Sequence, residues 1–318
     1  DVRPVDRSSC RRTQAMSSLR GSLNAGRKPL LREGQRLQPD GRPHGQRSGV
    51  TGEPVRDVDL NTDVADERAV LQRLADWPIT GIGLHPGGSN YVFVVRLTDP
   101  AKYDPESDDE VDEVASIYGI YKPLRGERPL RDFPGGTLHL RERAAYLVSK
   151  ALGWPRIPPT VIRAGPRGEG SVQLFIDEAE SDGVGGNFFS LREERLDDFR
   201  DIAMFDALVH NADRKGGSCI VSEDDQIWAI DHGLTFNQFA RRRTVMFEFN
   251  GTRYPDELLG DVEALADSLE SGGELEVDLL KLLEQADIDE LVTRAREMIE
   301  FGHYPVLDPD ANVPWPMV

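Results

Sequence analysis

The stretch His210–Phe236, HNADRKGGSCIVSEDDQIWAIDHGLTF, carries the pattern that decides the fold class. An apolar, helix-like run over 196–209 leads into NADR, which contains Asp213, and a predicted hairpin over 218–230 then returns the chain to DHG, which begins with Asp231. Carboxylates at the two open ends of one hairpin can converge on a point, which suits a divalent cation and a hydroxyl that loses its proton. Asp is also common as a cap or turn residue. The helix before the pair and the glycine after it favour the functional interpretation.

Two halves of different character surround this stretch. Before it, short β-branched, aromatic or alternating runs predict strands at 91–97, 115–121, 161–163 and 171–176. Apolar periodicity predicts a helix that begins near Asp63 or Asp66 and carries Ala69, Val70, Leu71 and Leu74, and a second helix at 138–152. After it, apolar periodicity predicts three helices near 256–271, 275–285 and 287–302. The sequence therefore predicts an α+β fold with a small β-rich N-lobe over 64–178 and a helical C-lobe over 179–318.

Residues 1–63 differ from the rest of the chain. Positions 1–56 contain 12 Lys and Arg against 5 Asp and Glu, which leaves 26 against 51 for the remainder of a chain of net charge −18. This segment is rich in Arg, Gly, Ser, Pro and Gln and lacks aliphatic periodicity, so we expect a disordered basic tail or a mis-set start rather than a domain. A nucleic-acid-binding arm is the alternative, whereas the acidic body should repel nucleic acid.

Composition excludes several protein classes. The 318 residues are 38% hydrophobic, and no run approaches the eighteen or so uncharged apolar residues of a membrane-spanning helix. The first thirty residues lack the apolar core of a secretory signal. Two distant cysteines, Cys10 and Cys219, provide neither a disulfide framework nor a cysteine-based zinc site. We expect a cytoplasmic protein.

NADRK, followed eighteen residues after Asp213 by the Asp of DHG, resembles the catalytic and metal-binding segments of the phosphatidylinositol 3-/4-kinase-like branch of the protein-kinase-like superfamily. The chain is most similar to an actinobacterial phosphatidylinositol-kinase-like family, with HipA-type kinases as more distant relatives, over roughly residues 64–318. The resemblance implies a bilobal protein-kinase-like fold. It also implies ATP and Mg²⁺ as cofactors, and transfer of the γ-phosphoryl group to a hydroxyl of a protein, a small metabolite or an inositol lipid.

The resemblance also implies roles for individual residues. Asp213 and Arg214 match the catalytic loop, where Asp213 would orient the acceptor hydroxyl. Asp231 matches the magnesium-binding aspartate. Lys122 ends a strand where the family places its phosphate-binding lysine, and Glu142 in the next helix matches the glutamate that pairs with it. Taken singly, Lys122 and Glu142 could each be an ordinary solvated charge.

Two further segments are expected to bind the nucleotide. A glycine-rich turn before the first predicted strand matches the phosphate-covering loop, since glycine N–H groups can approach phosphate oxygens closely. The strand that ends near 176 matches the hinge beside adenine. The residues assigned to these segments are Gly87, Gly88, Ser89 and Asn90 in the loop, and Gln173, Leu174, Phe175 and Ile176 in the hinge. A glycine turn alone is a weak signal.

The sequence departs from the family pattern at three places. Lys215 stands where the family has His after Asp-Arg, so that imidazole's role is lost or moved to His210 or His232. Ser218 occupies the second metal position, where a hydroxyl is a weaker magnesium ligand than an amide carbonyl. Arg241–Arg243 lies where a substrate-binding segment is expected; it could meet an anionic substrate or be a solvated loop.

These departures keep two alternatives open. The first is a nucleotide-binding pseudokinase or regulatory module, which would bind ATP with negligible turnover. The second is a nucleotidyl transferase on the same fold, because fold does not fix chemistry.

Overall fold

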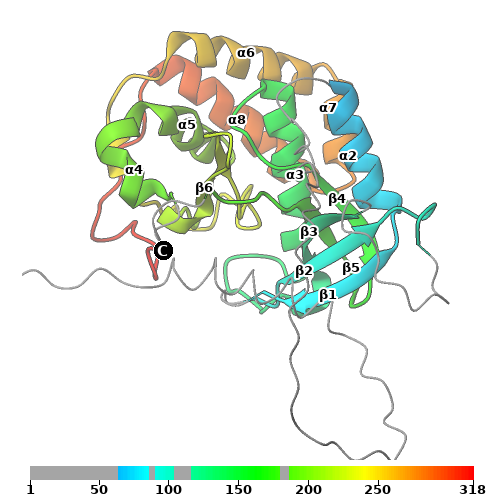
Figure 1. Cartoon of the computed structure of the whole chain (residues 1–318). Helices are drawn as coiled ribbons and strands as arrows, with labels where there is room; N and C mark the ends of the chain where they lie inside the picture. The colour runs from blue at the N-terminus through cyan, green and yellow to red at the C-terminus, as the bar shows by residue number, and fades with distance from the viewer. Residues whose placement is uncertain (1–63, 86–89, 104–115, 180–185) are drawn as a thin grey trace, which may run out of the picture.

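The computed structural model describes residues 64–85, 90–103, 116–179 and 186–318 (Figure 1). The first part contains an antiparallel five-stranded sheet in the order β1-β2-β3-β5-β4. Its strands are β1 (Ile79–Leu84), β2 (Phe93–Thr98), β3 (Ser116–Pro123), β4 (Thr160–Gly165) and β5 (Gly168–Leu174). β2 is buried at every position because it lies inside the sheet, whereas β1 at the edge is partly exposed.

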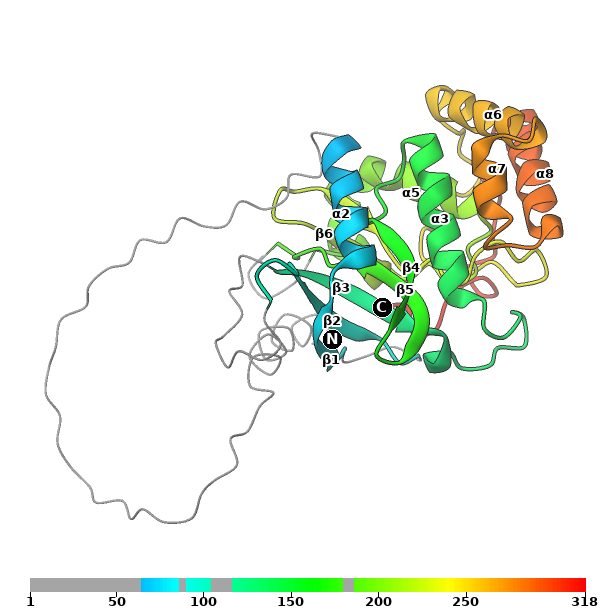
Figure 2. The same cartoon turned by 90° about the vertical axis from the view of Figure 1, so that its right-hand side faces the viewer.

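Two helices cover one face of this sheet, as Figures 1 and 2 show: α2 (Val64–Asp76) and α3 (Leu138–Leu152). Val70 and Leu74 of α2 pack with Val95, Tyr121 and Val172 in the core of the sheet. The two helices lie side by side, since the Tyr146 hydroxyl on α3 donates to Glu67 on α2 at 2.8 Å. α3 ends at Gly153, whose φ of 82° is the left-handed conformation that glycine adopts without strain.

The second part is helical. Its elements are α4 (Phe188–Arg195), α5 (Arg200–Leu208), α6 (Asp256–Glu270), α7 (Glu274–Leu279) and α8 (Gln285–Phe301), with a two-stranded hairpin of β6 (Cys219–Val221) and β7 (Ile227–Ala229). Short 3-10 turns lie at Leu124–Gly126, Leu196–Phe199, Gly216–Ser218 and Phe247–Phe249. Buried apolar side chains of α3, α5, α6 and α8 share one large core.

α3 joins the two parts of the molecule. The Arg141 guanidinium donates to the Thr235 carbonyl at 2.8 Å and to Asp287 of α8 at 2.9 Å. Burial lowers the pKa of Arg141 from its ordinary value, although the nearby charge of Asp287 opposes that effect. One helix therefore packs on the sheet and is anchored in the helical part.

The architecture confirms the predicted α+β fold, with a β-rich part followed by a helical part. Three local predictions were wrong. The stretch before β2, predicted as a turn, contains β1, because Ile82 and Leu84 alternate with glycines on an edge strand. The run predicted as one helix over 196–209 is a 3-10 turn followed by α5, and α4 precedes it. α7 ends at Leu279, six residues before the predicted end.

No helix in the part of the chain that the structure describes has both the length and the apolar character needed to cross a membrane.

Candidate active site

Lys122 of β3 lies at the centre of an ion-pair cluster. Its ammonium pairs with Oε1 of Glu142 on α3 and lies 2.7 Å from Oδ1 of Asp231. Burial by itself would lower the pKa of Lys122, but the charges of Asp231 and Glu142 outweigh burial and raise that pKa. The lysine therefore stays charged, and it joins the sheet, α3 and the DHG segment (Asp231–Gly233).

The backbones of β3 and β5 lie unusually close together at Lys122, and this contact helps to fix the position of the lysine. Gly170 of β5 lies beside Pro123 and the Lys122 carbonyl, where any Cβ would collide with the β3 backbone. A larger residue at 170 would push β3 and β5 apart and move Lys122. Glycine is therefore required at position 170 because the two strands pack closely there, not because the backbone makes a turn.

Glu142 contacts the DHG segment with its second oxygen. The His232 backbone N–H donates to Oε2 of Glu142 at 3.1 Å, in a buried environment. Because Oε1 pairs with Lys122, one carboxylate fixes both β3 and the DHG segment relative to α3. A buried carboxylate with both oxygens engaged orients its partners rigidly.

Asp231 is the most open carboxylate of the cluster, with half of its side chain exposed. Its φ is 62°, the left-handed conformation that Asp tolerates better than most residues. The Ser218 hydroxyl donates to Oδ2 of Asp231 at 3.4 Å, while Lys122 contacts Oδ1. Asp231 and Ser218 therefore present their oxygens on one side of the Lys122 cluster.

Asp213 lies in the loop of residues 210–217, hereafter the Asp213 loop, between two cations. Lys215 Nζ is 3.0 Å from its Oδ2, and Arg243 Nε is 4.0 Å from its Oδ1. Burial raises the pKa of Asp213 above its ordinary value, although Lys215 and Arg243 oppose the shift. Asp213 thus has the raised proton affinity of a carboxylate that can accept a proton.

Arg214 is fully buried and does not face the open side of the cluster. Its guanidinium donates to both oxygens of Asp206 on α5, at 2.6 and 2.9 Å. It also donates to the carbonyls of Ser218 and Ile230, at 2.8 and 3.0 Å. Arg214 is therefore a positioning residue that holds the Asp213 loop, the hairpin and the strand leading to Asp231 together.

His232 completes this buried network. Its Nε2 accepts from Arg214 Nη2 at 2.8 Å. Burial lowers the pKa of His232 well below its ordinary value, and the charges of Arg214 and Lys122 add to the shift. His232 is therefore neutral and serves as a hydrogen-bond acceptor, not as a proton donor to a ligand.

The residues expected to form the hinge, 173–176, are held by hydrogen bonds and apolar contacts to neighbouring segments. The buried Gln173 side chain donates to the Thr160 hydroxyl at 2.9 Å, which turns its amide into the sheet. The Leu174 and Phe175 N–H groups donate to Pro159 and Tyr118 at 2.8 and 3.0 Å. Ile176 packs with Ile220 and Trp228 of the hairpin. The strand thus connects the sheet to the hairpin, and the Gln173 amide is held against the neighbouring strand β4 by Thr160.

Three of the expected loop residues, Gly87, Gly88 and Ser89, lie outside the described residues. Asn90 is described, and its side-chain oxygen accepts from the Arg128 N–H at 2.9 Å. Asn90 therefore fixes the start of β2 against the turn that follows β3.

Sequence reasoning missed two residues of the site. Asp206 was not singled out, although a lone acid inside the apolar run of α5 signals a buried partner. Lys215 was treated only as a departure, whereas it is the direct ion-pair partner of Asp213. Neither contact follows from periodicity, because each depends on where the chain of an irregular loop directs its side chains.

A substitution tests the positioning role of Arg214. We expect Arg214→Met to lower the free energy of unfolding by about 3–5 kcal/mol, because Asp206 would stay buried without its cation. Urea denaturation measures this. Arg253→Met, which removes an exposed arginine paired with Asp256, should change stability little. Adding Asp206→Leu to Arg214→Met should restore part of the lost stability, because the buried carboxylate is then removed as well. If Arg214→Met were as stable as Arg253→Met, the positioning role of Arg214 would be contradicted.

The donor set at Asp231 suits a cation shared with a ligand. Within residues 64–85, 90–103, 116–179 and 186–318, no group of three or more His, Cys, Asp or Glu side chains could hold a metal ion. Magnesium commonly uses one or two protein carboxylates and takes its other ligands from phosphates and water. Asp231 with the Ser218 hydroxyl fits that pattern.

Comparisons with solved structures give distant likenesses. The crystal structure of the Golgi casein kinase with Mn and ADP bound has a TM-score of 0.47 and 17% identity, covering 76% of each chain. The structure of hydra Fam20 with sugar has a TM-score of 0.44 and 14% identity, covering 77% of this chain and 91% of that one. The Helicobacter pylori proinflammatory kinase CtkA has a TM-score of 0.38 and 13% identity, over 68% and 96% of the two chains.

Sequence comparison gives a nearer relative. No protein-family model matches the chain. The chain is 35% identical over 282 residues to Protein Rv2133c of Mycobacterium tuberculosis (strain ATCC 25618 / H37Rv), covering 79% of this chain and 95% of that protein. The narrower phosphatidylinositol 3-/4-kinase-like assignment stays a prediction. The chain belongs to the family of Protein Rv2133c.

Proposed function

We propose that this protein is a phosphotransferase that moves the γ-phosphoryl group of ATP to a hydroxyl acceptor. The observation that carries the proposal is the convergence of Lys122 and Glu142 with Asp231. A strand lysine paired with a helix glutamate, beside a metal-binding aspartate and a separate loop aspartate, is the arrangement with which protein kinases position ATP.

Each residue has a chemical role in this proposal. Lys122 binds phosphate oxygens of ATP, and Asp231 with Ser218 would hold Mg²⁺. The ion, when bound, neutralises the charge on the phosphates. Asp213 orients the acceptor hydroxyl and takes its proton as the new O–P bond forms, while the bond to the β-phosphate oxygen breaks and ADP leaves. Lys215 and Arg243 beside Asp213 stabilise negative charge on the transferred group.

A nucleotide-binding module without turnover is the second candidate. The observation that favours it is the Ser218 hydroxyl in the second metal position, 3.4 Å from Asp231. This candidate predicts ATP binding that survives while phosphoryl transfer is absent. A nucleotidyl transferase would instead place label from the α-phosphate on the acceptor.

Label transfer tests the proposal. The full chain is incubated with γ-³²P ATP, Mg²⁺ and a host-cell lysate, which is then fractionated into protein, lipid and small-metabolite pools. We expect label in one pool with the wild type and none above background with Asp231→Ala. Asp310→Ala, which removes an exposed carboxylate, is the matched control and should label as the wild type does. Equal labelling by the wild type and Asp231→Ala would reject the proposal.

A further inference from the structure

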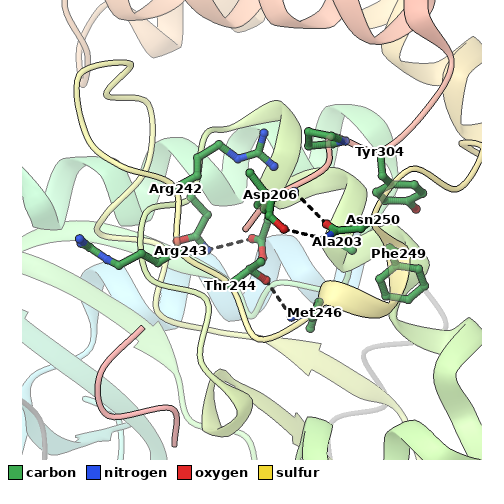
Figure 3. A pocket seen from close by; sticks show the side chains of 12 residues that line it. Ala203, Asp206, Arg242, Arg243, Thr244, Met246, Phe249, Asn250 and Tyr304 are labelled. Atoms are coloured by element: carbon green, nitrogen blue, oxygen red, sulfur yellow. Dashed lines mark hydrogen bonds between the residues drawn. The ribbon is translucent and has the colours of Figure 1, made fainter. Parts of the chain in front are cut away.

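The chain after α8 returns to the segment that carries Arg243. Together with α5, this chain and the segment 242–250 line a pocket, and Figure 3 shows the side chains of Arg242 and Arg243 pointing in different directions. Of the two, Arg243 lies beside Asp213, with 4.0 Å between its Nε and Oδ1 of the carboxylate. The course of the backbone at residue 243 therefore decides whether a guanidinium stands next to Asp213.

A turn over residues 308–312, hereafter the Asn312 turn, holds this backbone along one edge. The side-chain Nδ2 of Asn312 donates to the Arg242 carbonyl at 2.7 Å, and the Asn312 carbonyl accepts from the Thr244 N–H at 2.8 Å. These two backbone groups belong to the residues on either side of Arg243. One residue therefore binds the chain immediately before and immediately after Arg243.

The Asp213 loop holds the same backbone along its other edge. The Arg214 N–H donates to the Arg243 carbonyl at 3.0 Å, and the Val245 N–H donates to the Arg214 carbonyl at 3.2 Å. Successive peptide groups of an extended segment point to alternate edges, so the bonds to Asn312 and those to Arg214 leave the segment on opposite sides. The backbone of Arg243 is therefore held between Asn312 and Arg214.

The side chain of Arg243 continues this connection to the Asp213 loop. Its Nε donates to the Ala212 carbonyl at 2.9 Å, and the guanidinium is partly buried beside Asp213. Arg243 thus contacts the loop through both its backbone and its side chain. A shift of the backbone at residue 243 would move both sets of contacts together.

Asn312 is itself fixed within its turn. Its side-chain Oδ1 accepts from the Asp308 N–H at 3.1 Å, and its own N–H donates to the Asp308 carbonyl at 2.7 Å. Arg241 adds a contact to the same turn, since its Nη1 donates to the Ala311 carbonyl at 3.3 Å. The N–H, the carbonyl and both ends of the Asn312 amide are all hydrogen-bonded, so this half-buried side chain is a rigid link between two segments.

Beyond the turn, the chain contacts the Asp213 loop directly. The Gly216 N–H donates to the Met317 carbonyl at 2.8 Å, and Pro314 between the turn and this contact is buried. The chain after α8 therefore packs along the loop and is not a solvated extension.

We propose that Asn312 is a positioning residue that holds Arg243 beside Asp213. Asn312 acts through the backbone on either side of Arg243. Displacement of a reacting group by about 1 Å can lower a rate by roughly 10²-fold, so a residue that only fixes this segment can affect catalysis. The expected effect on turnover rests on the proposed function, whereas the expected effect on the surroundings of Asp213 does not.

Two substitutions of Asn312 test the contact in the full chain. Asn312→Ala removes both side-chain bonds, whereas Asn312→Asp keeps an acceptor for the Asp308 N–H and loses only the donor to the Arg242 carbonyl. We expect both variants to lower kcat at least about tenfold, with the Kd of Mg·ATP within about twofold of the wild-type value. Asp310→Ala, an exposed position in the same turn, is the control and should keep the wild-type kcat. A wild-type kcat in Asn312→Asp would overturn the proposal.

The proton affinity of Asp213 gives a readout that needs no turnover. The charged groups near this carboxyl include Lys215, Arg243 and Asp231, and the charge of Arg243 lowers the pKa of Asp213. If Arg243 moves away, that pKa should rise further. Carbon-13 NMR titration of the Asp213 carboxyl, with its signal assigned by its loss in Asp213→Asn, should show a higher midpoint in Asn312→Ala than in Asp310→Ala. Equal midpoints would overturn the proposal.

A double variant separates this role from a general loss of stability. In the Arg243→Met background, adding Asn312→Ala should lower kcat little further, because Asn312 acts through Arg243. Losses that simply multiply would contradict the proposal. A shifted Asp213 midpoint in a protein that transfers no phosphoryl group would reject the proposed function and support the role of Asn312. A wild type that transfers phosphate, with unchanged midpoint and kcat in Asn312→Ala, would reject the role of Asn312 alone.

Discussion

Asp213→Asn is expected to lower kcat about 10³-fold, within the range of general acid–base catalysis, while the Kd of Mg·ATP changes by less than about twofold. The amide keeps the shape of the side chain but cannot accept the hydroxyl proton. The nucleotide contacts assigned to Lys122 and Asp231 are untouched. Single-turnover transfer to the labelled acceptor measures the first quantity, and equilibrium binding of a non-hydrolysable ATP analogue measures the second.

The pH dependence gives an independent check on Asp213. Because burial raises the pKa of this carboxyl, the active, deprotonated form is lost as pH falls through a value above the ordinary 3.8. The wild type should show this acid limb, and the residual activity of Asp213→Asn should lack it. An acid limb that persists unchanged in the variant would assign that titration to another group. Asp310→Asn is the control that removes an exposed carboxylate.

Asp231→Asn should have the second large effect, with kcat lowered about 10³-fold and Mg·ATP affinity also reduced. An amide oxygen is a weaker magnesium ligand than a carboxylate, and the variant also removes one of the two anionic partners of Lys122. Steady-state kinetics over a range of Mg²⁺ concentrations measures both changes. The two variants should differ in what they change. Asp213→Asn should lower kcat alone, whereas Asp231→Asn should lower both kcat and the affinity for Mg·ATP.

The opposite result would be informative. If Asp231→Asn lowered only kcat and Asp213→Asn lowered nucleotide affinity, the assigned roles would be exchanged. If both variants bound and turned over ATP as the wild type does, the site would lie elsewhere. Asp225→Asn offers a control in the same hairpin, where an exposed aspartate pairs with Arg195.

The fold class could be predicted from the sequence, and so could three residues of the ion-pair cluster around Lys122. These residues could be found because they follow a fixed order along the chain. Lys122 at the end of a strand, Glu142 in the following helix and Asp231 after the hairpin are in contact in the structure. Their chemical roles stay proposals. The order of strand, helix and hairpin could be predicted because each element has its own local periodicity.

Contacts that depend on packing could not be predicted in the same way. Arg214 was expected to act with Asp213, but its burial against Asp206 depends on how α5 lies beside the hairpin. The run Arg241–Arg243 was considered as one unit, whereas Arg241 binds the Ala311 carbonyl, Arg242 lines a pocket and Arg243 lies beside Asp213. Adjacent residues in an irregular segment point in different directions, and no periodicity records this.

The direct contact between Lys122 and Asp231 has a thermodynamic consequence. A cation that binds Asp231 must compete with an ammonium already placed 2.7 Å away, so the protein carries its own competitor for the metal. Free Mg²⁺ should therefore bind weakly. A nucleotide that offers Lys122 a new anionic partner would release Asp231, and linkage then requires that metal and nucleotide raise each other's affinity by the same factor. Metal and nucleotide should accordingly bind as one cooperative unit.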